Sequence, residues 1–198
     1  MHSPEAFRSV FSSALPYGRY IESAKANERA NWDKIYNSTQ LSETQVSLVR
    51  SFARRVNVLV ISGTWCGDCV QQCPILARIA EAFPAPVDSE TASGVDVRFI
   101  DRDIEAEFVK PFKICGGQRV PTAIWLNEEF EFLSLLGDRT LTRYRGMAAR
   151  QLGPSCPLPG APLPADEKDA VIAEWLGECE RAALICRLSP RLRQKHND

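Results

Sequence analysis

Between residues 56 and 152, short apolar runs alternate with longer segments of helical periodicity. The run VNVLVIS is apolar and β-branched along most of its length, which is typical of a strand buried on both faces. The predicted elements, in chain order, are a strand at 56–62, a helix at 75–83, a strand at 95–101, a short helix at 104–112, a hairpin of strands at 122–127 and 130–136, and a helix at 140–153. This β-α-β-α-β-β-α order predicts an α/β domain with a central mixed sheet and helices on both faces.

The sequence before this domain has a different pattern. Residues 1–55 are expected to form an N-terminal helical extension packed on the core. Within it, apolar residues recur at helical intervals between residues 17 and 36. A further helix is expected to begin at Ser42, because Ser42 and Gln45 have the spacing of a capping box.

The sequence after the domain, residues 153–198, is predicted to be a connector followed by a helix. Five prolines at 153–165 exclude regular helix and central strand. The following segment places Cys179 and Cys186 on one apolar helical face, where they are interpreted as core residues. The basic end of the chain is interpreted as a solvated helix terminus, where cations are favoured.

Composition narrows the class of protein. The chain has 198 residues, of which 44% are hydrophobic and 25% charged, so a sizeable core can form. A formal net charge of −1 gives no overall drive toward nucleic acid or a membrane surface. No apolar run is long enough to span a bilayer and the N-terminus has no signal-peptide core, so we expect a cytoplasmic protein.

The chain has seven cysteines. In the cytoplasm thiols stay reduced, so these cysteines are not expected to form structural disulfides. An odd number of cysteines argues against a disulfide scaffold, and a closely spaced pair there is more often catalytic or metal-binding. Three of them, Cys66, Cys69 and Cys73, lie in the stretch SGTWCGDCVQQCP. Cys156, in the proline-rich connector, has no role that the sequence decides.

Cys66 directly follows the first predicted strand and lies at the expected start of a helix. Free backbone N–H groups and the helix dipole stabilise a thiolate at such a position. Cys69 lies one turn further on, close enough for its sulfur to attack a mixed disulfide formed on Cys66. The order strand, C-x-x-C, helix therefore indicates dithiol chemistry.

Here the sequence resembles the thioredoxins. TWCGDC is similar to their active-site motif WCGPC, with Asp68 in place of the proline. Pro74 stands where thioredoxins carry a proline within the helix. RVPT at 119–122 resembles the loop that holds their cis-proline, which makes Pro121 the candidate. Gly137 matches a glycine of the family at the same distance beyond that proline. The resemblance covers 56–152.

This resemblance implies a thioredoxin fold and a thiol–disulfide oxidoreductase. Cys66 would be the attacking thiolate and Cys69 the resolving thiol. The substrate surface would comprise Trp65, Gly67, Val120 and Pro121. The implied redox group is the Cys66–Cys69 disulfide, with no other cofactor and no metal. The implied partners are a disulfide-containing protein or small thiol substrate and an external reductase or thiol as electron donor, with no nucleic acid and no membrane.

The departures from the family carry information. Thioredoxins bury an aspartate six residues before the first cysteine, where this chain has Val60. Asp68 places a negative charge beside the thiols and is expected to raise the pKa of Cys66. Arg119 would offset this charge if its side chain turned inward. A less stabilised thiolate makes a poorer oxidant, so the sequence favours a reductant.

Other interpretations remain open at this stage. Cys66, Cys69, Cys73 and Cys115 supply four thiolates for a zinc or iron–sulfur site, although a second C-x-x-C is missing. Cys73 and Cys115 are possible third thiols. Alternatively, Cys73 is a small buried core residue and Cys115 is a loop residue, both without a redox role. A thioredoxin-like fold can also serve as a docking module in which the dithiol is a redox sensor or a relic.

Overall fold

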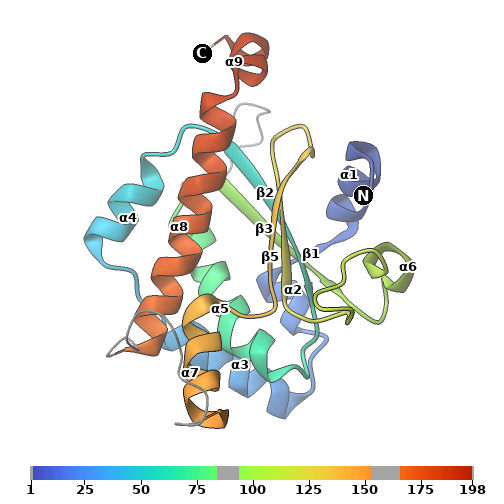
Figure 1. Ribbon diagram of the computed structural model, residues 1–198, viewed down its shortest axis with the longest axis vertical. Helices are drawn as coiled ribbons and strands as arrows, with labels where there is room; N and C mark the ends of the chain where they lie inside the picture. The colour runs from blue at the N-terminus through green and yellow to red at the C-terminus, as the bar shows by residue number, and fades with distance from the viewer. Residues whose placement is uncertain (1, 84–93, 153–165, 198) are drawn as a thin grey trace.

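The computed structural model describes residues 2–83, 94–152 and 166–197 (Figure 1). The predicted connector at 153–165, with Cys156, and the loop expected after residue 83 lie largely outside the described residues. The elements are α1 (Pro4–Ser13), β1 (Leu15–Pro16), α2 (Tyr17–Ile21), α3 (Ala26–Ser38), α4 (Glu43–Arg50), β2 (Arg55–Ser62), α5 (Gly67–Glu81), β3 (Gly94–Asp101), α6 (Ala106–Val109), β4 (Thr122–Leu126), β5 (Phe132–Gly137), α7 (Leu141–Gln151), α8 (Glu167–Leu188) and α9 (Pro190–His196).

A mixed sheet forms the centre of the protein, in the strand order β1-β3-β2-β4-β5. β2 runs parallel to β3, with Val60 beside Phe99, and antiparallel to β4, with Val60 beside Ala123. Every residue of β2 after Arg55 is buried, because helices cover both faces of the strand. The predicted α/β class and the order β-α-β-α-β-β-α are confirmed.

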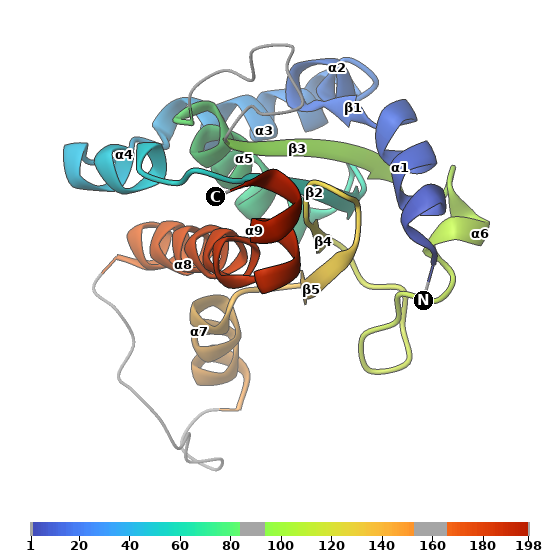
Figure 2. The same ribbon diagram turned by 90° about the horizontal axis from the view of Figure 1, so that it is seen from above.

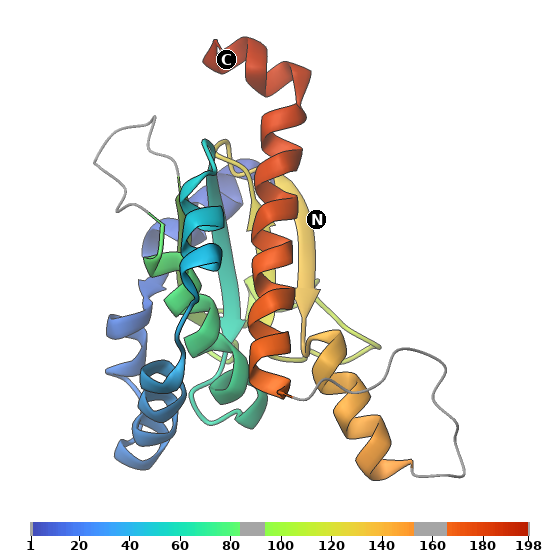
Figure 3. The same cartoon turned by 90° about the vertical axis from the view of Figure 1, so that its left-hand side faces the viewer.

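Helices from distant parts of the chain share one face of the sheet. α5 packs between α3 and α8, and α8 also contacts β2 and β5 (Figures 2 and 3). α1 and α6 lie on the opposite face, where Phe7 of α1 meets Phe108 of α6 with ring centroids 5.8 Å apart. The result is a three-layer arrangement with β2 and β4 in the middle.

The sequence suggested that the N-terminal extension is helical throughout, but the structure shows that it is not. Leu15 and Pro16 form a short strand that pairs antiparallel with Phe99 and Arg98 at the edge of the sheet. The expected helix at 17–36 is interrupted after Ile21 and resumes at α3. A two-residue edge strand has no periodicity of its own, and only pairing with β3 defines it.

The C-terminal helix α8 lies against the sheet domain. Trp175 of α8 is buried and stacks on Trp125 of β4, with ring centroids 6.4 Å apart. Glu174 accepts hydrogen bonds from the backbone N–H groups of Leu141 and Thr142, each 2.7 Å long. These groups belong to the first turn of α7 and have no partner inside that helix, so Glu174 caps α7.

The basic end of the chain is not simply solvated. Arg191 pairs with Glu131, and the Lys195 Nζ lies 2.7 Å from a carboxylate oxygen of Glu129. The His196 Nε2 lies 3.4 Å from Glu128. α9 therefore packs against the acidic turn between β4 and β5. The two segments are far apart in the sequence, so these ion pairs could not be predicted from it. Among the described residues, no helix is both long and apolar enough to cross a membrane.

Candidate active site

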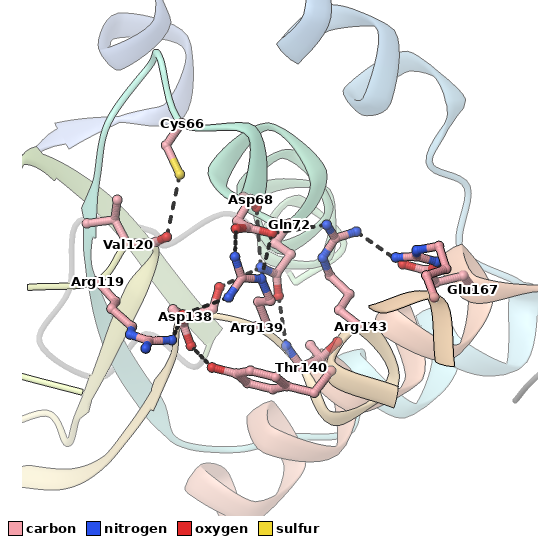
Figure 4. Close-up of polar contacts among 12 residues, drawn as sticks. Cys66, Asp68, Gln72, Arg119, Val120, Asp138, Arg139, Thr140, Arg143 and Glu167 are labelled. Atoms are coloured by element: carbon pink, nitrogen blue, oxygen red, sulfur yellow. Dashed lines mark hydrogen bonds and ion pairs between the residues drawn. The ribbon is translucent and has the colours of Figure 1, made fainter. Parts of the chain in front are cut away.

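Cys66 and Cys69 lie where β2 passes into α5. Cys66 is the N-cap residue of α5 and is half-buried, whereas Cys69 is fully buried in the first turn. The Cys66 thiol donates to the backbone carbonyl of Val120, with 3.5 Å between sulfur and oxygen (Figure 4). Gly67 begins α5, and a side chain there would meet open space. One thiol is thus accessible and the other is held beneath it.

The pKa values of the two thiols differ from the simple expectation for a helix start. A hydrogen bond with the Cys69 sulfur raises the pKa of Cys66, and burial and the charge of Cys69 act in the same direction. The backbone N–H groups of Cys69 and Asp68 act to lower it but are outweighed. Burial raises the pKa of Cys69 as well. The helix start therefore offsets part of the desolvation without producing an acidic thiol.

The loop at Val120 and Pro121 lies opposite Cys66. The Val120–Pro121 peptide bond is cis, and both side chains are buried. Gly137 at the end of β5 leaves room for this loop, because a Cβ atom on Gly137 would lie 2.8 Å from the Pro121 carbonyl oxygen and 2.9 Å from Thr122 Oγ1. Only glycine permits this approach without movement of the loop.

Trp65 forms the exposed part of the site. Its side chain is 51% exposed, and the Arg102 guanidinium lies over the indole ring, 4.7 Å from the centroid. A charge on Cys66 acts on Arg102 and helps to raise the pKa of the arginine, after the larger effect of Asp103. Arg102 therefore lies near both Trp65 and Cys66. The sequence pattern did not single out this cation.

Helix α3 supports the loop that precedes Cys66. The indole N–H of the fully buried Trp32 donates to the Thr64 carbonyl oxygen across 2.9 Å. The Thr64 hydroxyl in turn donates to the Glu28 carboxylate across 2.8 Å. The N-terminal extension thus contributes directly to the position of the dithiol.

Asp68 is neutralised by arginines that lie far away in the sequence. Arg139 pairs with both carboxylate oxygens of Asp68, its Nε lying 3.0 Å from Oδ1 (Figure 4). Arg143 of α7 adds a contact of 3.1 Å to Oδ1 and reaches Glu167 with its other nitrogen. The charge of Asp68 is consequently balanced by neighbours on α7 and the turn before it.

The sequence suggested that Arg119 could balance the charge of Asp68, but in the structure it does not. It pairs instead with Asp138, whose Oδ2 lies 3.2 Å from the Arg119 Nη1 and 3.1 Å from the Arg139 Nη1. The Tyr144 hydroxyl donates to the other oxygen of Asp138. The Asp138 side chain is 3% exposed, which by itself raises its pKa, but the bonds from Tyr144, the backbone and Arg119, with the charge of Arg139, bring the net pKa below the usual value.

Gln72 fixes the same turn to α5. Its side-chain nitrogen donates to the Asp138 carbonyl oxygen across 2.9 Å, and its oxygen accepts from the Thr140 N–H across 3.0 Å (Figure 4). Gln72 is fully buried, so both polar ends of its side chain are used. This buried glutamine links the cysteine helix to the segment that supplies the arginines.

The remaining cysteines are separated from the accessible thiol. Cys73 is 2% exposed and lies beneath Cys69, with its sulfur 3.7 Å from the Ser62 hydroxyl. Cys115 is exposed, in the turn closed by Ile114 and Gly117. Cys179 and Cys186 are buried in α8. In the parts of the chain that the structure describes, no three His, Cys, Asp or Glu residues are grouped as metal ligands.

Sequence reasoning missed Trp32, Arg102, Asp138, Arg139 and Arg143. Two signals were available. The DRT sequence directly follows the family glycine Gly137, and charged residues at such a point are candidates for contact with the active-site loop. Arg102 directly follows the second predicted strand. If this strand runs parallel to the first, the two strands end at the same edge of the sheet, so Arg102 would lie near Cys66.

Comparison with known proteins identifies the fold and the family. No curated protein matches the chain. A protein of unknown function from Pseudomonas aeruginosa has a similar structure, with a TM-score of 0.66 and 18% identity over 92% of this chain and 99% of that one. An HIV epitope-scaffold has a TM-score of 0.64 and 16% identity over 88% and 97% of the two chains. The family described as Thioredoxin matches residues 14–143, more than half of the 198 residues. The chain therefore belongs to the thioredoxin family.

Proposed function

We propose that the protein is a thiol–disulfide oxidoreductase that reduces disulfides through Cys66 and Cys69. The Cys66 thiolate attacks one sulfur of a substrate disulfide, forms a mixed disulfide and releases the other sulfur as a thiolate. Cys69 then attacks the Cys66 sulfur, releases the second substrate thiol and leaves a Cys66–Cys69 disulfide. An external thiol or reductase returns two electrons and restores the dithiol.

The observation that carries this proposal is the unequal burial of two adjacent thiols. The half-buried Cys66 sulfur can be approached from outside, and the buried Cys69 sulfur is within hydrogen-bonding distance of it. An attacking thiol needs access, whereas a resolving thiol needs only to reach the mixed disulfide. The arrangement suits this division of roles.

The thiol pKa values support reduction rather than oxidation. A dithiol is a strong oxidant when its thiolate form is stabilised, because the reduced state is then favoured. Here the pKa of Cys66 is raised by Cys69 and by burial. The reduced pair is therefore less stabilised and gives up its electrons more readily.

A protein substrate fits the surroundings of Cys66 well. Trp65 offers an exposed aromatic surface, and the Val120 backbone offers hydrogen-bonding groups beside Pro121. An extended segment of a partner would pair with this backbone as an added strand while its disulfide approaches Cys66. Arg102 covers one face of the Trp65 ring and pairs with Asp103, with 2.9 Å between its Nε and the Asp103 Oδ1, so its charge is already balanced within the chain.

The test is trapping of the mixed disulfide. Cys69→Ser should accumulate a Cys66-linked adduct with a disulfide-containing protein such as insulin, detected by non-reducing mass spectrometry. Cys66→Ser should abolish turnover and trapping. Cys115→Ser is the control, because it removes an exposed thiol from the turn closed by Ile114 and Gly117 and should retain turnover. Absence of both turnover and trapping in correctly folded protein would favour a docking module.

A further inference from the structure

Arg102 directly follows β3 and contacts two different loops of the active site. Its backbone N–H donates to the Ser62 carbonyl oxygen at the end of β2, across 2.9 Å. Its guanidinium lies over the Trp65 indole ring, 4.7 Å from the centroid. Nη1 of the same side chain donates to the Gln118 carbonyl oxygen across 3.4 Å. Arg102 therefore joins the loop before the dithiol to the loop before the cis-proline.

Asp103 sets the orientation of this guanidinium. Its two carboxylate oxygens accept from Arg102 Nε across 2.9 Å and from Nη2 across 3.3 Å, which leaves Nη1 for Gln118. The Asp103 N–H in turn donates to Asp101 Oδ1 across 2.8 Å. With its charge balanced inside the chain, Arg102 is better suited to hold two loops in place than to attract an anionic substrate.

Gly63 gives Trp65 a second support. A Cβ atom on Gly63 would lie 2.7 Å from Cε2 and 2.9 Å from Cζ2 of the indole, so the ring rests directly on the Gly63 backbone. The ring is 51% exposed, yet it contacts both this backbone and the Arg102 guanidinium. An exposed tryptophan is thus held in one orientation.

The contacts of Arg102 complete a ring around the Cys66 sulfur. The sulfur donates to the Val120 carbonyl oxygen across 3.5 Å (Figure 4). Val120 is two residues after Gln118, and Trp65 directly precedes Cys66. Arg102 is the link that joins Trp65 to Gln118. Without its side chain, the two loops would be free to move relative to each other.

A protein disulfide gains from surfaces that are already in place. A segment that pairs with the Val120 backbone while its disulfide reaches Cys66 also comes against Trp65. Ordering a loose side chain on binding costs affinity, and a preformed site avoids that cost. A small disulfide needs only access to the Cys66 sulfur, so it gains little from the same arrangement.

We propose that Arg102 is a positioning residue that holds Trp65 and the loop before Pro121 at a fixed separation, so that protein disulfides meet a preformed surface around Cys66. Arg102 acts through these two surfaces and takes no part in the transfer of electrons or protons. This proposal rests on the proposed dithiol function, and it names protein disulfides as the substrate class that the site favours.

The test measures the reduction of insulin by Arg102→Gln and by wild type, with dithiothreitol as the external thiol. Arg102→Gln should raise KM for insulin by roughly three- to tenfold, as for a side chain that has to be ordered on binding. kcat should change by less than about twofold, because the lost contacts act on binding and not on the reacting sulfurs. The rate of Cys66 with the small disulfide 5,5′-dithiobis(2-nitrobenzoate) should change by less than KM does.

Arg102→Lys separates geometry from charge. A lysine keeps the positive charge but has one compact donor group, so it cannot pair with both Asp103 oxygens, cover Trp65 and reach Gln118 at once. KM for insulin in Arg102→Lys should therefore stay close to the Arg102→Gln value.

Arg98→Gln is the matched control. Arg98 belongs to the same strand, its guanidinium lies over the Phe11 ring, 5.1 Å from the centroid, and it pairs with Asp96. Its side chain is 32% exposed, against 27% for Arg102. The contacts are of the same kind but lie toward α1, so KM for insulin should keep its wild-type value in this variant.

Acrylamide quenching of tryptophan fluorescence tests the structural step without turnover. Trp65 is 51% exposed, whereas each of the other three tryptophans is at most 2% exposed, so quenching reports mainly on Trp65. Arg102→Gln should increase the quenching, because the indole loses its cover, and Arg98→Gln should leave it unchanged.

Three outcomes would overturn the proposal. They are an unchanged KM or unchanged quenching in Arg102→Gln, full recovery of KM by Arg102→Lys, and an equal rise of KM in Arg98→Gln. The dithiol function fails by a different result, namely no insulin reduction by wild type and no adduct on Cys66 in Cys69→Ser. Quenching alone would then decide whether Arg102 holds Trp65.

Discussion

The indole N–H of Trp32 donates a hydrogen bond of 2.9 Å to the carbonyl oxygen of Thr64, two residues before the accessible cysteine. Trp32 belongs to α3 and Thr64 to the loop after β2, so this bond joins the N-terminal extension to the active site. The strand-to-helix junction that carries Cys66 is thus held from outside the sheet as well as by it.

Trp32→Phe should destabilise the protein by about 1–3 kcal/mol, because it leaves the Thr64 carbonyl without its donor. It should also change the rate of Cys66 alkylation by iodoacetamide. Trp175→Phe is the control, since the Trp175 indole nitrogen is buried and has no hydrogen-bond partner among the residues that the structure describes, so only packing is lost there. Denaturant unfolding and alkylation rates would measure both effects. Unchanged alkylation in Trp32→Phe would show that the loop holds its position without the bond.

Arg139→Gln should slow alkylation of Cys66 by roughly two- to fivefold at neutral pH, because half-buried charges are only partly screened. The variant removes a cation that pairs with Asp68 and Asp138, so negative charge near the thiol increases and its pKa rises further. Adding Asp68→Asn should restore much of the rate. If the double variant stays as slow as the single one, the charge of Asp68 does not reach Cys66.

Gly137→Ala should destabilise the protein by about 1–3 kcal/mol and reduce turnover, because the added methyl would lie 2.8 Å from the Pro121 carbonyl oxygen. Gly177→Ala in α8 is the control with the opposite expected sign. A methyl at Gly177 meets open space, and helix propensity predicts a gain of about 1 kcal/mol. Unfolding midpoints of the two variants should therefore move apart.

Acid should weaken the fold through Asp138. Its pKa in the folded protein is lowered from 3.8, so its contribution is present above that pH and is lost as the pH falls through the lower folded value. Asp138→Asn should be less stable than wild type at pH 6, and the difference should shrink below pH 4. Unfolding curves between roughly pH 6 and pH 3 would measure this. A constant difference across that range would assign the loss to packing instead.

High salt should loosen α9 more than α8. α9 is held to the hairpin turn by ion pairs from Arg191 and Lys195 that are partly exposed, and each is worth about 0–1 kcal/mol. Amide exchange in α9 should accelerate between roughly 0.05 and 1 M salt, where the screening length falls several-fold. Trp175 and its neighbours on α8 are buried, so exchange there should stay slow. Equal acceleration in both helices would indicate a general loss of stability.

The sequence was sufficient for those features that depend on local pattern. A short β-branched apolar run located β2, and a capping box located the start of α4. The strand-to-helix junction placed Cys66 at the start of α5 because the buried strand ends directly before it. These features depend on residues that are close in the sequence.

The charge balance of the site was not predictable in this way. Asp68 and Arg139 are 71 residues apart, and the pairing of β5 with β4 and of β4 with β2 brings them together. Arg119 was the nearest cation to the proline loop, but Asp138 lies closer to it than Asp68 does in the folded protein. The edge strand β1 was also missed, because two residues cannot display a period.

The cap that Glu174 places on α7 has a practical consequence for protein engineering. A fragment ended at residue 152 would retain both cysteines but would lose the carboxylate that satisfies the Leu141 and Thr142 N–H groups. It would also expose Trp125, which now stacks on Trp175. The same fragment would release Arg143 from Glu167 while leaving it beside Asp68. A minimal version of this protein for screening or fusion therefore has to extend through α8.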